Sequence, residues 1–228
     1  MITLLTPFGE AHFEIRADSK TDKAVLKEIL AENVYHVHSN MLSDNGTVLD
    51  VGANIGAFTI DILLRAHVER KRIHVVAVEP QPQNLALLKR NLQLNKRLLE
   101  HGSKVTIVEK AIGDQPGTVK ISNEHGSSRI ADEGVEVEMI TLNELFSRYQ
   151  LVEVGFAKFD IEGSEVPALL AAPDDTIDAM HRTAIEFDDH NGLDNFGKLI
   201  NRFGRKCSFY TLGVPARGCY IYTERHIL

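Results

Sequence analysis

The stretch Val48-Leu49-Asp50-Val51-Gly52-Ala53-Asn54-Ile55-Gly56-Ala57-Phe58 is the point from which the rest of this chain can be read. Its apolar residues and one acid predict a short strand, a Gly-x-Asn-x-Gly turn follows, and an amphipathic helix begins directly afterwards. A strand that passes through glycines into a helix builds the floor of a pocket, because the free N–H groups of the helix face the ligand. Gly52 and Gly56 admit a ligand or a neighbouring chain where a Cβ would collide, and Asn54 tolerates left-handed backbone angles.

The turn does not fit two common phosphate-binding patterns. The dinucleotide fingerprint Gly-x-Gly-x-x-Gly is absent, because Asn54 stands between two glycines that are four residues apart. The Gly-Lys-Ser/Thr ending of a phosphate loop is absent as well. Asp50 would repel a pyrophosphate, but its carboxylate suits a ligand that carries an ammonium or sulfonium group. A tight strand–helix turn without a ligand is the alternative interpretation.

A second acid closes the next predicted strand. The run Ile73–Val78 is largely apolar and ends at Glu79-Pro80, 29 residues after Asp50. An acid at the end of the second strand of a β-α-β unit is placed to accept hydrogen bonds from both ribose hydroxyls of a nucleoside. Alone, Glu79 could be a solvated strand-end acid. Together with the Asp50 turn, it predicts a ligand that contains adenosine.

A third strand is expected over residues 104–109, followed by Ala111-Ile112-Gly113-Asp114. This segment would lie beside the first two strand ends, where an adenine ring needs apolar cover and one polar contact. Ala111, Ile112 and Asp114 are the candidates for that role, and a simple Gly-Asp turn is the alternative.

Length and composition are those of one α/β domain. A chain of 228 residues can bury a full core and still carry a cap. We expect a single domain over residues 1–228, with an N-terminal cap over 1–40 and a catalytic core over 47–228. Residues 1–15 predict a hairpin, and Asp18 or Ser19 can cap a following helix. This N-terminal segment is expected to cover one edge of the core.

Charge and cysteine usage exclude several classes of partner. A net charge of −7 makes nucleic acid and anionic membranes poor partners. No apolar run approaches the ~20 residues of a membrane span, and the start lacks the pattern of a signal peptide. The two cysteines, Cys207 and Cys219, lack zinc-site spacing and are expected to be buried rather than disulfide-bonded. We therefore expect a soluble cytoplasmic protein that acts on a small molecule; its oligomeric state is left open.

The remaining elements follow from apolar periodicity. Helices are expected over residues 55–66 and 81–99, and core strands over 154–160 and 181–187. Residues 118–122 and 135–140 predict an inserted strand pair joined by a polar loop over 123–129, which is a candidate for acceptor recognition. Thr141 and Glu144 form a capping box for a short helix, and residues 206–222 predict a closing hairpin.

The order of these segments resembles the FkbM-type methyltransferases that depend on S-adenosylmethionine. The resemblance covers residues 47–187 and rests on six stretches: 49–56, 78–80, 111–114, 140–145, 158–165 and 184–186. The Lys-x-Asp-x-Glu-Gly-x-Glu stretch at 158–165 is the most particular to the family. Departures are modest, with Asn143 where an Asp is usual and Phe159 where an aliphatic residue is common.

The resemblance implies a Rossmann-like, doubly wound α/β fold with seven strands, the last one antiparallel. It implies methyl transfer to the oxygen of a sugar or another small hydroxylated metabolite. An NAD or nucleotide-sugar oxidoreductase and a catalytically silent binding protein are the alternatives. The cofactor S-adenosylmethionine is expected to be bound by Asp50, Gly52, Ala53, Asn54, Gly56, Glu79, Ala111, Ile112 and Asp114.

The catalytic candidates lie at the carboxyl ends of the last core strands, where open α/β sheets place their ligands. They are Asp160, Glu162, Asp188 and His190. Asp160 is expected to form the site floor, and Asp188 or His190 to be the base that a hydroxyl nucleophile needs. Together with Asp189 these oxygens and one histidine could instead hold a divalent metal such as Mg²⁺. Lys158 and Glu165 are expected to form an ion pair that fixes the loop between them.

Overall fold

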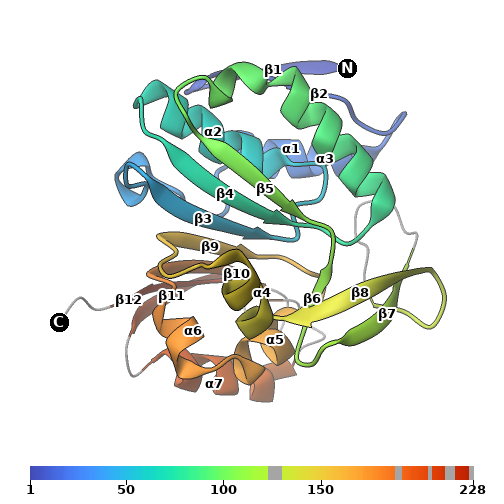
Figure 1. Ribbon diagram of the computed structural model, residues 1–228, viewed down its shortest axis with the longest axis vertical. Helices are drawn as coiled ribbons and strands as arrows, with labels where there is room; N and C mark the ends of the chain where they lie inside the picture. Colours follow the sequence, from blue (N-terminus) through green and yellow to red (C-terminus); the bar gives the residue numbers. More distant parts are fainter. Residues whose placement is uncertain (123–129, 188–191, 205–206, 214–218, 226–228) are drawn as a thin grey trace.

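The computed structural model describes residues 1–122, 130–187, 192–204, 207–213 and 219–225. Within these residues, the centre is a seven-stranded sheet in the order β11-β12-β10-β9-β3-β4-β5 (Figure 1). In the described sheet β12 runs opposite to the other six strands, which are parallel to one another, so the predicted fold class is confirmed. The strands are β3 (Gly46–Val51), β4 (Ile73–Val78), β5 (Lys104–Val108), β9 (Phe156–Phe159), β10 (Arg182–Phe187), β11 (Cys207–Gly213) and β12 (Cys219–Arg225).

Helices cover both faces of this sheet (Figure 1). Because side chains alternate along a strand, Leu49 and Val51 of β3 enter one hydrophobic cluster and Val48 enters another on the opposite face. On the Val48 face lie α1 (Lys20–Leu30), α2 (Ala57–Val68) and α3 (Pro82–Leu94), and on the other α4 (Leu142–Tyr149), α5 (Glu165–Ala171), α6 (Asp174–Asp178) and α7 (Gly192–Phe203). Single 3₁₀ turns occupy Ser39–Met41 and Lys96–Leu99.

The N-terminal segment forms the predicted hairpin, β1 (Ile2–Thr6) and β2 (Gly9–Phe13), followed by α1 with Ser19 as its N-cap. It packs on helices α2 and α3 of the core. Ala11 and Phe13 are fully buried in the cluster that also contains residues of α2. The reason is the alternation in β2, which turns these apolar side chains toward the helices.

One asparagine of α3 and the asparagine that caps its C-terminus complete the outer edge of this hairpin. The His12 N–H donates to Asn95 Oδ1 at 3.0 Å, and Asn95 Nδ2 donates back to the His12 carbonyl at 2.6 Å. Asn91 pairs with Glu14 in the same way: the Glu14 N–H donates to Asn91 Oδ1 at 2.7 Å, and Asn91 Nδ2 donates to the Glu14 carbonyl at 3.1 Å. The predicted helix 81–99 is therefore shorter than expected: α3 ends at Leu94, and Asn95 serves as both its C-cap and a partner of β2.

A small sheet of β6 (Ala111–Gly113), β8 (Val135–Thr141) and β7 (Gly117–Ile121) projects from the core. The β7–β8 pair is antiparallel, as predicted, but residues 111–113, expected to be a loop, pair with β8 in parallel. Three residues are too few for a periodic pattern, so the sequence could not reveal this strand. The expected acceptor loop over 123–129 lies outside the described residues.

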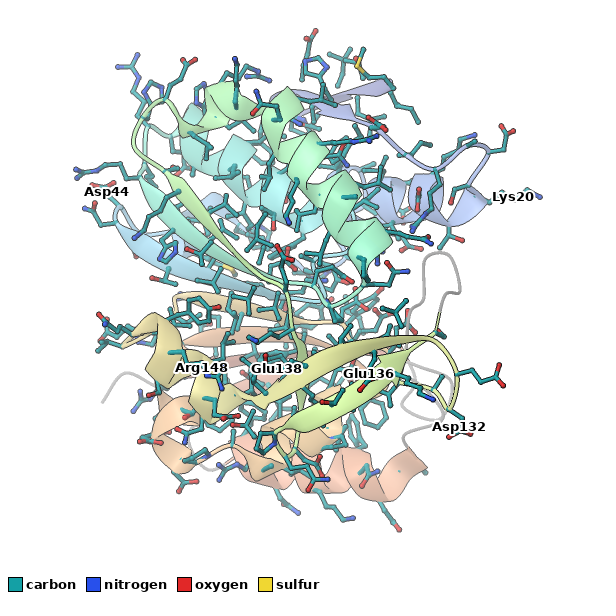
Figure 2. The ribbon with its side chains drawn as sticks, turned by 45° about the vertical axis from the view of Figure 1, so that its right-hand side comes forward. Lys20, Asp44, Asp132, Glu136, Glu138 and Arg148 are labelled. Atoms are coloured by element: carbon teal, nitrogen blue, oxygen red, sulfur yellow. The ribbon has the colours of Figure 1, made fainter. Side chains whose placement is uncertain are left out.

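The outer face of this small sheet is polar. Figure 2 shows Glu136 and Glu138 on β8, with Arg148 of α4 beside Glu138. Glu136 and Glu138 alternate with less exposed residues, and Glu138 lies 3.2 Å from Arg148 Nη1. The predicted capping box of α4 is confirmed, since Thr141 Oγ1 accepts from the Glu144 N–H at 3.2 Å and Glu144 accepts from the Thr141 N–H at 3.0 Å.

Both cysteines are buried, as predicted. Cys207 is opposite Arg225 and Cys219 is opposite Gly213, so they lie at opposite ends of the β11–β12 pair. In the part of the chain that the structure describes, none of the helices combines the length and the apolar character that crossing a bilayer requires.

Candidate active site

A cleft of about 210 Å³ opens at the carboxyl ends of β3, β4, β9 and β10. It lies beside the neighbouring strands β3 and β9, where the chain switches from one half of the sheet to the other, and ligands of open α/β sheets bind at such switch points. Its lining includes Gly52, Asn54, Glu79, Ala111 and Ile112, together with Tyr35 and the acids Glu28, Asp160, Glu162 and Glu186.

The turn after β3 has the geometry that its sequence predicts. Asn54 has a φ of 49°, in the left-handed region, and Gly56 has a φ of 90° at the N-cap of α2. Gly52 has a φ of 85°, and a Cβ placed there would lie 1.7 Å from the Asp160 carbonyl oxygen. Glycine at 52 is therefore required by the protein's own chain after β9, which crosses the turn at that point.

Glu79 lies at the cleft wall and is held by three N–H groups. It accepts from the Asn54 N–H at 2.8 Å, the Gln81 N–H at 2.9 Å and Asn84 Nδ2 at 3.2 Å. Burial raises the pKa of its carboxyl, and these donors oppose that shift. Each carboxylate oxygen has two lone pairs, so Glu79 can still accept a bond from a ligand. A ribose contact at this carboxylate stays a prediction.

Asn84 connects Glu79 to the N-terminal segment. Arg16 Nη1 donates to Asn84 Oδ1 at 2.7 Å, while Arg16 also forms an ion pair with the buried carboxylate of Asp22 on α1. Because Arg16 occupies the amide oxygen, the amide nitrogen of Asn84 is directed at Glu79. The orientation of the Glu79 carboxylate is therefore set from outside the catalytic core.

Asp50 does not face the cleft, which corrects the expectation that it contacts the ligand. The residue is 0% exposed. One carboxylate oxygen accepts from Thr59 Oγ1 at 2.7 Å and the other lies 3.3 Å from Lys158 Nζ. Lys158 is the partner of Asp50 in the β3–β9 register, so the lysine of the neighbouring strand balances this charge.

Lys158 does not pair with Glu165, so that prediction is wrong. Its ammonium lies 3.1 Å from Asp160 Oδ2 and donates to the Gly52 carbonyl at 2.6 Å. Burial alone lowers the pKa of Lys158, but the carboxylates of Asp160 and Asp50 more than offset this and raise it. Glu165 instead accepts the N–H groups of Ile161 and Gly163.

Asp160 and Glu186 stand side by side on the floor of the cleft. The parallel register pairs Phe159 with Ile185, and one residue further along each strand come these two acids. The register therefore brings their carboxyls next to each other, and the Tyr35 hydroxyl donates to Asp160 Oδ2 at 2.8 Å. Burial raises the pKa of Asp160, but Lys158 and the hydrogen bonds from Glu186 and Tyr35 lower it below its ordinary value.

The other predicted residues divide into three groups. Ala111, Ile112 and Glu162 line the cleft as expected. Ala53 and Gly56 are buried outside its lining, and Asp114 is exposed outside it. Asp188 and His190 lie outside the described residues. Among the residues that are described, no group of three His, Cys, Asp or Glu side chains could hold a metal ion.

Several cleft residues were missed by the sequence reasoning. Glu28 and Tyr35 come from the N-terminal segment, and their positions depend on long-range packing that no local pattern shows. Asn84 is one of several polar residues of α3, and no local pattern distinguishes it as the one that lines the cleft. Glu186 belongs to the Ala-Ile-Glu stretch that resembles the family, and its place at a strand end was the available signal.

Comparison with known proteins decides the family. Residues 50–209 match the Methyltransferase FkbM domain, which is more than half of the chain. The chain belongs to the FkbM methyltransferase family. FkbM-family relatives include 31-O-demethyl-FK506 methyltransferase FkbM from Streptomyces tacrolimicus, which is 23% identical over 83% of this chain and 83% of its own. Methyltransferase sdnD from Sordaria araneosa is 24% identical over 74% of this chain and 76% of its own.

A solved FkbM-family structure supports the fold. The methyltransferase FkbM from Methylobacillus flagellatus KT has a TM-score of 0.57 and 18% identity. The match covers 86% of the present chain but 47% of the other one, so this FkbM-family protein spans about half of that relative's length. The class I methyltransferase arrangement of the sheet is thereby confirmed.

Proposed function

We propose that this FkbM-family protein transfers the methyl group of S-adenosylmethionine to a hydroxyl oxygen of a small metabolite. The observation that carries the proposal is the cleft itself. It joins Glu79, held at the end of β4 by the N–H of the β3 turn, to a floor of carboxyls at the ends of β9 and β10. One half can hold a nucleoside, and the other can accept hydrogen bonds from hydroxyls.

The residues of the first half fit the methyl donor. Glu79 would accept from ribose hydroxyls, and the apolar side chains of Ala111 and Ile112 would cover the adenine. Asn54 lines the same wall, and its buried Oδ1 has no hydrogen-bond partner within the described residues. A buried acceptor without a donor costs free energy, so a donor from a ligand would stabilise this turn.

Methylation of oxygen is supported by a relative and by the acids of the cleft. The name of the Streptomyces tacrolimicus relative describes an O-demethylated acceptor, and this chain covers most of that protein. Here the carboxyls of Glu28, Asp160, Glu162 and Glu186 line the other half of the cleft. Carboxylates accept hydrogen bonds from hydroxyl groups and repel phosphates and other anions.

The bound donor supplies an electrophilic methyl group on a sulfonium. The protein must align the acceptor oxygen with it, a positioning effect that reaches ~7–11 kcal/mol in favourable cases. It must also take the hydroxyl proton. An oxidoreductase on the same topology is disfavoured by the absent Gly-x-Gly-x-x-Gly fingerprint. A silent binding protein is the second alternative and is tested by activity.

Binding calorimetry tests the first step of the proposal. Titration with S-adenosylmethionine and S-adenosylhomocysteine should give saturable heat, whereas NAD should give none. Glu79→Gln should weaken binding about tenfold or more, because it removes a charged acceptor for two hydroxyls. Glu109→Gln is the matched control: this exposed acid follows the neighbouring strand β5 and lies outside the cleft lining, so it should leave the affinity unchanged.

Activity tests the second step. Labelled methyl groups should pass from S-adenosylmethionine to at least one member of a panel of hydroxylated metabolites, sugars included. Saturable donor binding with no transfer across a broad panel would favour the silent binding protein, and absence of donor binding would end the proposal. Turnover in excess EDTA decides the metal alternative, because a required divalent ion would be removed.

A further inference from the structure

The carboxyls of Asp160 and Glu186 form a pair that the proposed function leaves without a defined role. We propose that this pair holds one proton in the free protein, releases it when the cationic methyl donor binds, and takes up the acceptor's hydroxyl proton during methyl transfer. This inference rests on the proposed function and assigns a catalytic role to Glu186, in place of the bases expected at 188 and 190.

Strand register brings the charged groups into one row. Asp50 pairs with Lys158 across β3 and β9, and Lys158 pairs with Ala184 across β9 and β10. Side chains two residues apart share a face, so Asp160 and Glu186 lie on the same face as Lys158, one step nearer the cleft. Both acids line the cleft, where an acceptor hydroxyl can reach them.

The row contains more negative than positive groups. Three carboxyls, Asp50, Asp160 and Glu186, are arranged around the single ammonium of Lys158. Register places the carboxyls of Asp160 and Glu186 next to each other at the carboxyl ends of β9 and β10, and one proton shared by the two relieves their mutual repulsion. With that proton, the row carries one net negative charge. Without it, a second unbalanced charge would have to stay in a half-buried site.

Titratable groups on the neighbouring elements surround the pair. Tyr220 of β12 lies opposite Glu186 of β10 in the antiparallel register. The ring of Tyr35 packs edge-to-face on the ring of Tyr220, with the centroids 5.6 Å apart. Burial raises the pKa of the Tyr220 phenol, and the charges of Glu186, Glu28 and Asp160 raise it further. The titratable groups that face the pair include Lys158, Asp50, Glu28, Tyr35, Glu165, Tyr220 and Tyr222.

The proton balance follows from charge. A bound sulfonium adds one positive charge to the cleft and makes loss of the shared proton favourable. In the transfer, the acceptor oxygen forms its bond to the methyl carbon as the carbon–sulfur bond breaks, and the hydroxyl proton passes to the carboxyl pair. The sulfonium charge disappears in the same step in which the proton arrives, so the charge of the cleft is conserved.

Calorimetry in two buffers measures this proton directly, without an acceptor. The same titration in phosphate and in Tris at one pH gives the number of protons released, because the two buffers differ in ionisation heat. The wild-type chain should release up to about one proton on binding S-adenosylmethionine. It should release less than about half as many with S-adenosylhomocysteine, which lacks the sulfonium charge.

Variants assign the proton to the pair. Glu186→Gln should bind the donor but release less than about half of the wild-type number of protons. Glu153→Gln, an exposed acid on the segment that enters β9, should match the wild type. Equal proton release with both ligands, or an unchanged number in Glu186→Gln, would overturn the inference while the proposed function stands. If the variant fails to fold, the comparison of the two ligands on the wild type still decides. A wild type that binds neither ligand contradicts the proposed function itself.

Discussion

Arg16 illustrates how a single residue far from the cleft can control a residue inside it. Its guanidinium is fixed by Asp22 and directs the Asn84 amide, whose nitrogen then donates to Glu79. Arg16 is absent from the cleft lining. It is therefore a positioning residue for the nucleoside half of the site.

Replacing Arg16 by methionine should weaken donor binding about fivefold, because Asn84 loses the bond that fixes its orientation toward Glu79. Arg97→Met provides the control: Arg97 also ties the N-terminal hairpin to the core, through the Glu10 carbonyl, but has no link to Glu79. Calorimetric titration of both variants measures the effect. Equal losses of donor affinity in the two variants would show that Arg16 affects binding only through the overall stability of the fold.

Residue roles were the part of this protein that its sequence predicted least well. Asp160 and Glu162 were expected at a site at the carboxyl ends of the core strands, and both line the cleft. The partner of Lys158 was misassigned, because its pairing with Asp50 depends on the register between β3 and β9, and register is a property of two distant segments. Asn54 and Glu79, whose roles follow from backbone angle and strand position, were placed correctly.

At the scale of elements, the turn between β9 and α5 is stabilised by the first residue of the helix. Glu162 and Gly163 both have positive φ, at 58° and 102°, and the carboxylate of Glu165 accepts the N–H groups of Ile161 and Gly163. Burial raises the pKa of this carboxyl from 4.5 to about 7, although these N–H donors lower it. The turn is therefore sensitive to pH.

Glu165 binds a proton more tightly in the folded chain than in the unfolded chain. Its contribution to the unfolding free energy is fully present below pH 4.5 and is lost as the pH rises to about 7. The stability of the wild type relative to Glu165→Gln should therefore fall by up to about 3 kcal/mol across this window. Urea unfolding at several pH values measures it. The corresponding difference for Glu153→Gln should be flat, and a flat difference for Glu165→Gln would contradict the assignment.

Elements were predicted well wherever apolar periodicity was long enough. The strands of the main sheet and the helix α2 were predicted from patterned apolar runs, and α4 was predicted from its capping box. The short strand β6 and the end of α3 were missed, because each depends on a partner elsewhere in the chain: β8 for the former and β2 for the latter.

The whole molecule unfolds as one unit if the N-terminal segment belongs to the core. Phe13 is fully buried in the cluster that contains Phe58 of α2 and Phe156 of β9. Phe13→Ala should lower the unfolding free energy by about 3–5 kcal/mol and shift the single transition of the entire protein. Leu5→Ala, at a position that is 83% exposed on β1, should change it by less than about 0.5 kcal/mol. A separate early transition in the Phe13 variant would show that the hairpin is an independent appendage.

The asparagine contacts of β2 also have a consequence for synthesis on the ribosome. The side-chain amides that complete this edge belong to Asn91 and Asn95. Asn91 lies 77 positions after Glu14 in the chain, and Asn95 lies 83 positions after His12. During translation the hairpin is made well before its partners, so the backbone groups of His12 and Glu14 must remain hydrated until α3 has emerged. Docking of the N-terminal ribbon is therefore a late event, and a paused nascent chain that stops short of residue 91 should leave it accessible to proteases.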